Sequence, residues 1–342
     1  MMANDNSKPG KRSKGQRKSS RGITRRDFLK GVGMAGGLVA LGNLDHLAAL
    51  AAGEEEETPV EVRPLPKRAL GSMGFNASVL GMGGTHICDG AVEDGIAILD
   101  RALELGITYY DSASQYGSGE SERRYGAWLE RLQSEGRRNE VFFATKTLQR
   151  AYTDAKQEIA GSVERLRGSR IDLLQLHAII DEGTLRVVMS RNGSLKAAEE
   201  AKRAGQVRHI GITNHRDPEI LLKALDEFPF DSVLVDLGIA DRMRRPFADI
   251  LPQLVEKNIS IVAMKVFAEG NLPGAGADLE RCLHYTLSLP VSTAIIGMKS
   301  PAEVEQNVSW VHSYEGMTEE EIQALEEEIG GLVDVNTFWW KG

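Results

Sequence analysis

Short apolar runs alternate with amphipathic segments along the chain from residue 67 onward. A helix-like segment follows each run; within residues 92–106, for example, Ile96, Leu99 and Leu103 fall on one helical face. The runs are rich in β-branched and aliphatic residues, which is typical of buried strands. They span residues 78–83, 107–111, 141–146, 171–177, 209–213, 232–237, 260–266 and 293–297.

Eight strand–helix units over roughly 280 residues predict an α/β protein with the architecture of a (β/α)8 TIM barrel. Residues 67–78 predict a small N-terminal hairpin that would close the bottom of the barrel, and residues 318–332 predict an extra C-terminal helix. A doubly wound open sheet is the alternative. It is disfavoured because no G-x-G-x-x-G turn follows any of the strands.

Charge is distributed unevenly along the chain. Residues 1–30 hold ten Lys or Arg, whereas the whole chain has a formal net charge of −8. Nucleic acid is not expected as a partner, because the acidic body would repel phosphate backbones. Two cysteines, Cys88 and Cys282, are too few for a disulfide framework or a Cys-rich metal site, and we expect no metal. A single pairing, a reactive thiol and simple burial all stay open for these two side chains.

The basic segment ends in an arginine pair, Arg25 and Arg26, before Phe-Leu-Lys and a Gly-rich apolar segment. This arrangement resembles a twin-arginine (Tat) export signal, and residues 49–51 offer small side chains at cleavage spacing. A transmembrane anchor is the alternative, although the glycines make a poor membrane span. We expect the Tat export machinery as a partner and a periplasmic or other extracytoplasmic location. The membrane would be contacted only through the signal segment, if it stays uncleaved.

The chain therefore divides into three parts. A signal peptide occupies residues 1–52, and residues 53–66 form an acidic linker interrupted by prolines. The barrel occupies residues 67–342.

Polar side chains stand where consecutive predicted strands end. Asp111 ends the second strand, Lys146 the third and His177 the fourth, while Tyr116 lies in the loop after the second. The active sites of such barrels lie at the carboxyl ends of the strands, so these four side chains should meet at one rim. Taken singly, each residue also has a structural explanation. Asp111 could cap a helix, Tyr116 could anchor the loop, Lys146 could be a surface charge and His177 could be a hydrogen-bonded core histidine. A lysine that ends an apolar strand, however, needs a carboxylate partner, which Asp111 would supply.

Together the four groups suit the reduction of a carbonyl. A carbonyl that receives a hydride builds negative charge on its oxygen and needs a proton donor at neutral pH. A phenol, with an ordinary pKa of about 10, becomes a better acid beside an ammonium that a carboxylate holds in place. A neutral imidazole can orient the carbonyl.

Five stretches resemble the aldo-keto reductase superfamily over about residues 67–315. The resemblance implies a (β/α)8 reductase that uses NADPH, less often NADH, without a metal, and that acts on a small-molecule carbonyl substrate. By position, Tyr116 takes the role of general acid, Lys146 and Asp111 tune it, and His177 orients the carbonyl. The stretches are residues 109–126, 141–146, 171–177, 204–215 and 292–308.

The resemblance also implies cofactor contacts. Thr213 and Asn214 match the pair that holds the nicotinamide amide, and Lys265 and Phe267 match a loop along the pyrophosphate. Segments around the adenosine phosphate and the adenine are matched by Gly297, Met298, Lys299, Gln306 and Asn307.

The chain departs from the family pattern at the cofactor. Leu234 and Leu237 stand where the family usually has a Gln on the nicotinamide amide and a Tyr stacked on the ring, and Ser112 replaces a Thr. NADPH differs from NADH by a 2′-phosphate, which Lys299 would attract and Glu303 would repel. We predict NADPH as the cofactor, with NADH as the alternative. A non-catalytic barrel that keeps the cofactor as a sensor or partner subunit is the other functional reading. It is disfavoured because burying an idle polar cluster is costly.

Overall fold

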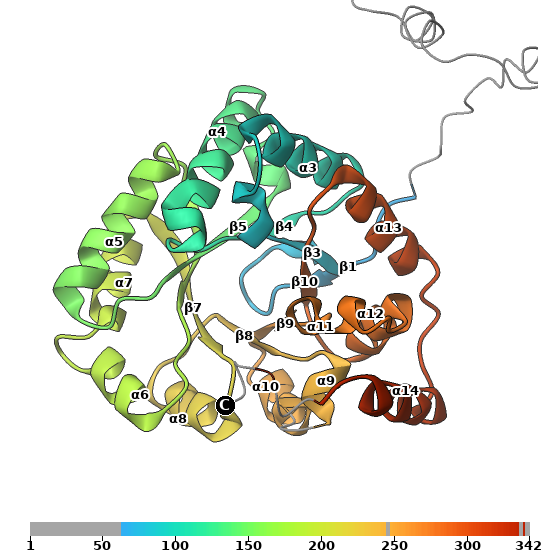
Figure 1. Ribbon diagram of the computed structural model, residues 1–342. Coiled ribbons are helices and arrows are strands. Elements are labelled where there is room, and N and C mark those ends of the chain that lie inside the picture. The colour runs from blue at the N-terminus through green and yellow to red at the C-terminus, as the bar shows by residue number, and fades with distance from the viewer. Residues whose placement is uncertain (1–62, 244–246, 335–337, 339–342) are drawn as a thin grey trace, which may run out of the picture. The chain divides into compact units, whose positions relative to one another are not determined.

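A closed barrel of parallel strands forms the centre of the protein (Figure 1). A computed structural model describes residues 63–243, 247–334 and 338. Around the barrel the strands follow one another as β10-β3-β4-β5-β6-β7-β8-β9. Their bounds are β3 (Leu80–Gly83), β4 (Tyr109–Asp111), β5 (Phe142–Thr147), β6 (Ile171–Leu176), β7 (Val207–Asn214), β8 (Ser232–Asp236), β9 (Ser260–Met264) and β10 (Thr293–Gly297). This closure confirms the predicted (β/α)8 barrel and excludes the doubly wound open sheet, which has two free edges.

Helices surround the barrel, as Figure 1 shows. Their bounds are α3 (Val92–Glu104), α4 (Glu120–Ser134), α5 (Tyr152–Arg165), α6 (Glu182–Met189), α7 (Ser194–Arg203), α8 (Pro218–Glu227), α9 (Ile239–Arg242), α10 (Leu251–Glu256), α11 (Asn271–Gly274), α12 (Leu279–Ser288), α13 (Pro301–His312) and α14 (Glu319–Leu332). Short 3-10 turns include η2 (Thr85–Cys88) and η3 (Tyr116–Gly119). Helix α14 confirms the predicted C-terminal helix. None of the helices within the described residues combines the length and apolar character needed to cross a membrane.

The predicted N-terminal hairpin is present and fills one end of the barrel. Strands β1 (Lys67–Ala69) and β2 (Asn76–Ser78) pair antiparallel. Leu70 and Met73 of this hairpin join a buried cluster that includes Tyr109 and Phe142, the first residues of β4 and β5. The hairpin therefore packs at the end where the strands begin and leaves the carboxyl ends for the site. The first predicted barrel strand, residues 78–83, is shorter than expected because Ser78 pairs with Lys67 in the hairpin.

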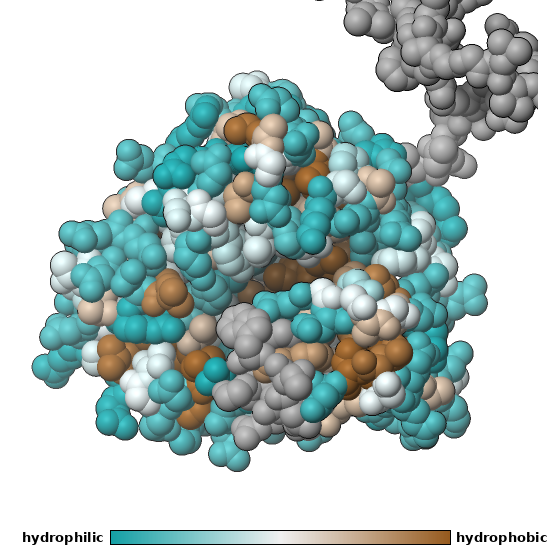
Figure 2. Space-filling model, in the orientation of Figure 1, coloured by the Kyte–Doolittle hydropathy of each residue, from teal (hydrophilic) through white to brown (hydrophobic). Residues whose placement is uncertain are grey.

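Side chains that alternate along each strand form two hydrophobic layers, one between the barrel and the helices and one inside the barrel. Leu174 and Leu176 of β6 belong to the main core, which also contains helix side chains, whereas Leu173 belongs to the cluster inside the barrel. Since successive strand residues face opposite sides, Gln175 and His177 share the inward face with Leu173. In the orientation of Figure 1, Figure 2 shows hydrophobic residues at the centre of the ring and mostly hydrophilic ones over the outer helices.

The predicted signal peptide, residues 1–52, lies outside the described residues, as does most of the predicted linker.

Candidate active site

A buried ion pair joins the ends of β4 and β5. Lys146 donates to Asp111 Oδ1, and its Nζ also lies 2.8 Å from the backbone oxygen of Ser112. The side chains of Lys146 and Asp111 are 2% and 1% exposed, so water screens their attraction very little. Burial raises the pKa of the Asp111 carboxyl, and Lys146 opposes that rise. Burial lowers the pKa of Lys146, but Asp111 and Tyr116 together bring it above its ordinary value. The lysine is therefore an ammonium at neutral pH.

Tyr116 lies directly against this ammonium. The Lys146 Nζ is 5.1 Å from the centroid of the Tyr116 ring, and a hydrogen bond to the phenol contributes to the raised pKa of Lys146. After the tyrosine the chain turns sharply, with Gly117, Ser118 and Gly119 all at positive φ. A Cβ on Gly117 would lie 2.7 Å from the Cys88 sulfur, so a larger residue there would displace the Cys88 side chain as well as strain the backbone. The small residues after Tyr116 thus let the chain turn back into α4.

His177 follows β6 at the same rim and is neutral. Burial lowers its pKa well below the ordinary 6.5, and the positive charge of Lys146 lowers it further. Its Nδ1 lies 2.7 Å from Nε2 of Gln115, the residue before Tyr116. With the Gln115 amide donating to Nδ1, the ring proton sits on Nε2, which can then donate to a carbonyl oxygen. The structure therefore brings all four predicted catalytic side chains together, while their roles stay predictions.

Thr213 and Asn214 end β7 and organise the neighbouring loops. The Thr213 hydroxyl accepts from the Ala178 N–H at 2.7 Å. The Asn214 amide nitrogen donates to the carbonyls of Ile179 and Asp217, at 2.6 and 3.0 Å. Its oxygen accepts from two N–H groups of the following turn. Asn214 thus ties the β7–α8 turn to the loop after β6 with both of its amide protons, and of this pair only the Thr213 hydroxyl keeps a proton to donate to a nicotinamide amide.

The predicted adenosine segment lies at the start of α13. Ser300 caps the helix by accepting from the Glu303 N–H at 3.2 Å, and the Glu303 carboxylate accepts from the Lys299 N–H at 2.8 Å. The N-terminal end of a helix favours anions, but here the Glu303 carboxylate already accepts from the N–H just before the N-cap residue. Asn307 Oδ1 is buried and has no hydrogen-bond partner among the described residues. An unpaired buried acceptor fits the amino group of an adenine, so these residues are compatible with a nicotinamide dinucleotide.

The other residues predicted to bind the cofactor differ in their surroundings: some are paired or packed against neighbours, one is buried in the core and one is exposed. Lys265 forms an ion pair with Glu269, and Phe267 packs edge-on against Trp310 with centroids 6.2 Å apart. Met298 is fully buried in the main core. Gly297 ends β10, and Gln306 is exposed on α13.

The two leucines that depart from the family pattern are both fully buried. Leu234 lies in the cluster inside the barrel and Leu237 in the main core. Neither offers a hydrogen bond to a nicotinamide amide.

Three polar groups at this rim were not predicted. The Gln175 amide donates to Asp111 Oδ2 at 2.9 Å, and Gln115 contacts His177 as described above. His215 lies with its ring centroid 6.3 Å from that of His177 and its Nδ1 3.1 Å from Asp236 Oδ1. The sequence held a signal for Gln175, since it interrupts the apolar residues 173–176 and shares the parity of His177 along the strand.

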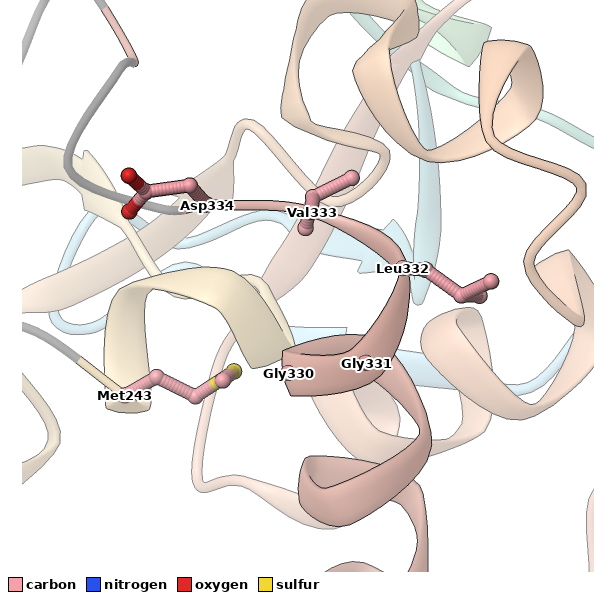
Figure 3. Close-up of a pocket in the computed structure, with 6 residues that line it drawn as sticks. All are labelled: Met243, Gly330, Gly331, Leu332, Val333 and Asp334. Carbon is pink, nitrogen blue, oxygen red and sulfur yellow. The ribbon is translucent and has the colours of Figure 1, made fainter.

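A cavity of about 410 Å³ lies at the end of α14, and none of these groups lines it (Figure 3). It is lined by Met243, Gly330, Gly331, Leu332, Val333 and Asp334.

Comparison with known protein families agrees with this site: residues 79–281 match the model of the aldo/keto reductase family. The chain belongs to this family. It is 28% identical over 313 residues to the L-galactose dehydrogenase of Arabidopsis thaliana, covering 78% of this chain and 95% of that one. A D-threo-aldose 1-dehydrogenase of a Pseudomonas species is 29% identical over 231 residues, covering 60% and 68%.

Among solved structures, the holo form of the aldo-keto reductase AKR11C1 from Bacillus halodurans superposes with a TM-score of 0.65 at 26% identity. The match covers 77% of this chain and 96% of that one. This aldo/keto reductase is therefore an NAD(P)-dependent oxidoreductase that acts on carbonyl compounds.

Proposed function

We propose that this reductase converts an aldehyde or ketone to an alcohol with Tyr116 as the general acid and NADPH as the cofactor. The observation that carries the proposal is the buried Lys146–Asp111 pair, whose ammonium lies 5.1 Å from the centroid of the Tyr116 ring. An ammonium in this position can stabilise the negative charge that develops on the phenol oxygen as the proton moves to the alkoxide.

The nicotinamide, when bound, supplies the hydride. Tyr116 gives its proton to the oxygen of the reacting carbonyl, and the ammonium of Lys146 stabilises the phenolate that is left. Asp111 keeps the ammonium charged in a site from which water is excluded. His177 is neutral and donates its ring N–H to the same oxygen, which fixes the carbonyl relative to Tyr116. Thr213 and the α13 segment would hold the two ends of the cofactor.

The substrate is a small carbonyl compound, and aldose sugars are the first class to test. Two relatives are named as sugar dehydrogenases. Gln115, His177 and His215 also give this rim several hydrogen-bonding groups, as a polyhydroxylated substrate requires. The panel should therefore contain aldehydes and ketones with NADPH, and aldoses with NADP⁺ in the oxidative direction.

The decisive variant is Tyr116→Phe. We expect kcat to fall by roughly 10²–10⁴ while the Kd for NADPH stays unchanged, because the phenol acts only in the chemical step. Tyr152→Phe is the matched control, since that phenol donates to Glu200 on a peripheral helix. Parent-like turnover by the Tyr116 variant would assign the proton to another group. A parent protein that binds NADPH but turns over no carbonyl would favour the sensor or partner-subunit reading.

We also propose that the protein is exported through the Tat route as a folded, cofactor-loaded enzyme. The arginine pair of residues 25–26 supports this, and NADPH is not supplied outside the cytoplasmic membrane. Cofactor binding would stabilise the folded cargo by mass action. Changing Arg25 and Arg26 to Lys should retain the protein inside the cell, whereas Arg17→Lys with Arg21→Lys should not. Exported protein that releases no nicotinamide cofactor on denaturation would refute the loading step.

A further inference from the structure

Gln175 lies beside the Lys146–Asp111 ion pair, inside the barrel. It is fully buried on β6 and its neighbour in the parallel register is Lys146 on β5. Its Nε2 is 2.9 Å from Asp111 Oδ2, on a strand two positions away around the barrel. The amide therefore reaches past β5 to the carboxylate that pairs with Lys146.

Each oxygen of Asp111 has one side-chain donor among the described residues. Oδ1 receives the ammonium of Lys146 and Oδ2 receives the amide of Gln175. The carboxyl is 1% exposed, so burial favours its neutral form and raises its pKa, which Lys146 and the Gln175 hydrogen bond both oppose. Without the amide, one oxygen of a desolvated carboxylate would lose its donor.

The other end of the same side chain argues against a purely structural role. Gln175 Oε1 is buried and has no hydrogen-bond partner among the described residues. An unpaired buried acceptor destabilises the fold, and a leucine or methionine would fill the space without this penalty. The amide orientation follows from charge, because a carbonyl oxygen facing the carboxylate would be repelled. What the glutamine supplies that an apolar side chain cannot is the N–H to Asp111.

We propose that Gln175 is a positioning residue that holds the Asp111 carboxylate against Lys146, so that the ammonium stays beneath Tyr116. This inference rests on the proposed role of Tyr116 as the general acid. Gln175 touches no reacting atom and acts only through Asp111 and Lys146.

The test compares two Gln175 variants with the parent. Gln175→Met keeps the side-chain length without the amide, and Gln175→Leu provides a second variant in case one of the two does not fold. Leu173→Met is the matched control, because Leu173 faces the same barrel interior from the same strand without contacting Asp111 by a hydrogen bond. The first readout needs no cofactor: the infrared band of the protonated Asp111 carboxyl, assigned by its absence in Asp111→Asn, is followed against pH.

We expect this band to appear at a higher pH in both Gln175 variants than in the parent and in the Leu173 control. Among the other titratable groups, Lys146 pairs with Asp111, Tyr116 contacts Lys146, and the phenols of Tyr109 and Tyr125 interact with the Asp111 charge. Burial raises the pKa of the last two well above the ordinary value, so they stay neutral throughout the titration.

The second readout is turnover. In the Gln175 variants kcat should fall on the order of ten-fold, with the Kd for NADPH within about two-fold of the parent. An unshifted Asp111 band, or an equal loss in Leu173→Met, would overturn the inference. Parent-like activity in Tyr116→Phe would instead overturn the proposed function, and the infrared titration of Asp111 would still decide the role of Gln175.

Discussion

Removing one partner of the Lys146–Asp111 pair should be far more damaging than removing both. The two side chains are 2% and 1% exposed, so neither group can recover its hydration when the other is lost. In Lys146→Met the carboxylate of Asp111 keeps the Gln175 amide as its one side-chain donor from the part of the chain that the structure describes. We expect the free energy of unfolding to fall by about 3–5 kcal/mol, which is the usual effect of leaving a buried charge unpaired.

The double variant Lys146→Met with Asp111→Asn removes both charges of this pair, so neither is left unpaired. Its stability should return to within about 1–2 kcal/mol of the parent, because a buried ion pair contributes little net stability over a neutral replacement. Its turnover should not return, since the phenol of Tyr116 then lacks the ammonium. Urea unfolding of the parent, both single variants and the double variant gives the coupling free energy, and NADPH oxidation with an aldehyde gives the rates.

The pH dependence of Lys146→Met provides an independent check. Without the ammonium that opposes it, burial raises the pKa of the Asp111 carboxyl further above its ordinary 3.8. The folded variant therefore binds this proton more tightly than both the unfolded chain and the folded parent, in which the pKa is already raised. Its stability relative to the parent should decline as pH rises through the Asp111 pKa of the folded parent, which lies above 3.8. Additive stability effects, or a double variant that turns over at the parent rate, would refute the buried-pair reasoning.

Two other variants test the neutral state of His177 and the charge of Glu303. His177→Gln removes a ring whose pKa burial lowers well below 6.5, so the parent should lose stability relative to this variant as pH falls through 6.5. The slope should be up to about 1.4 kcal/mol per pH unit, and unfolding curves of the two proteins that stay parallel would contradict it. Glu303→Gln removes the carboxylate that accepts the Lys299 N–H and should lower the Kd for NADPH by about five-fold without changing that for NADH. The control is Glu305→Gln on the same helix, which alters only a contact with Arg101 of α3. An equal change for both cofactors would contradict the placement of the phosphate.

The architecture and the main polar groups could be predicted because they follow from local patterns. Each barrel strand is a short apolar run followed by a helical period, and that alternation permits few other arrangements. Asp111, Lys146 and His177 were predictable because each ends such a run, and the carboxyl ends of parallel strands meet at one rim. The N-terminal hairpin and the C-terminal helix could also be predicted from the local sequence pattern of residues 67–78 and 318–332.

The sequence by itself thus determined the barrel, the identity of the charged groups at its rim and the resemblance to one family. Only the tertiary structure decided which atoms they meet. Gln175 is 64 residues from Asp111 in the chain, and no local period reports that their side chains touch. The same holds for Asn214, whose amide is committed to loop carbonyls, and for Glu303, whose carboxylate turns back onto the Lys299 N–H. Hydrogen-bond partners depend on the stagger of strands around a closed barrel and on side-chain orientation, and both exist only once the chain is packed.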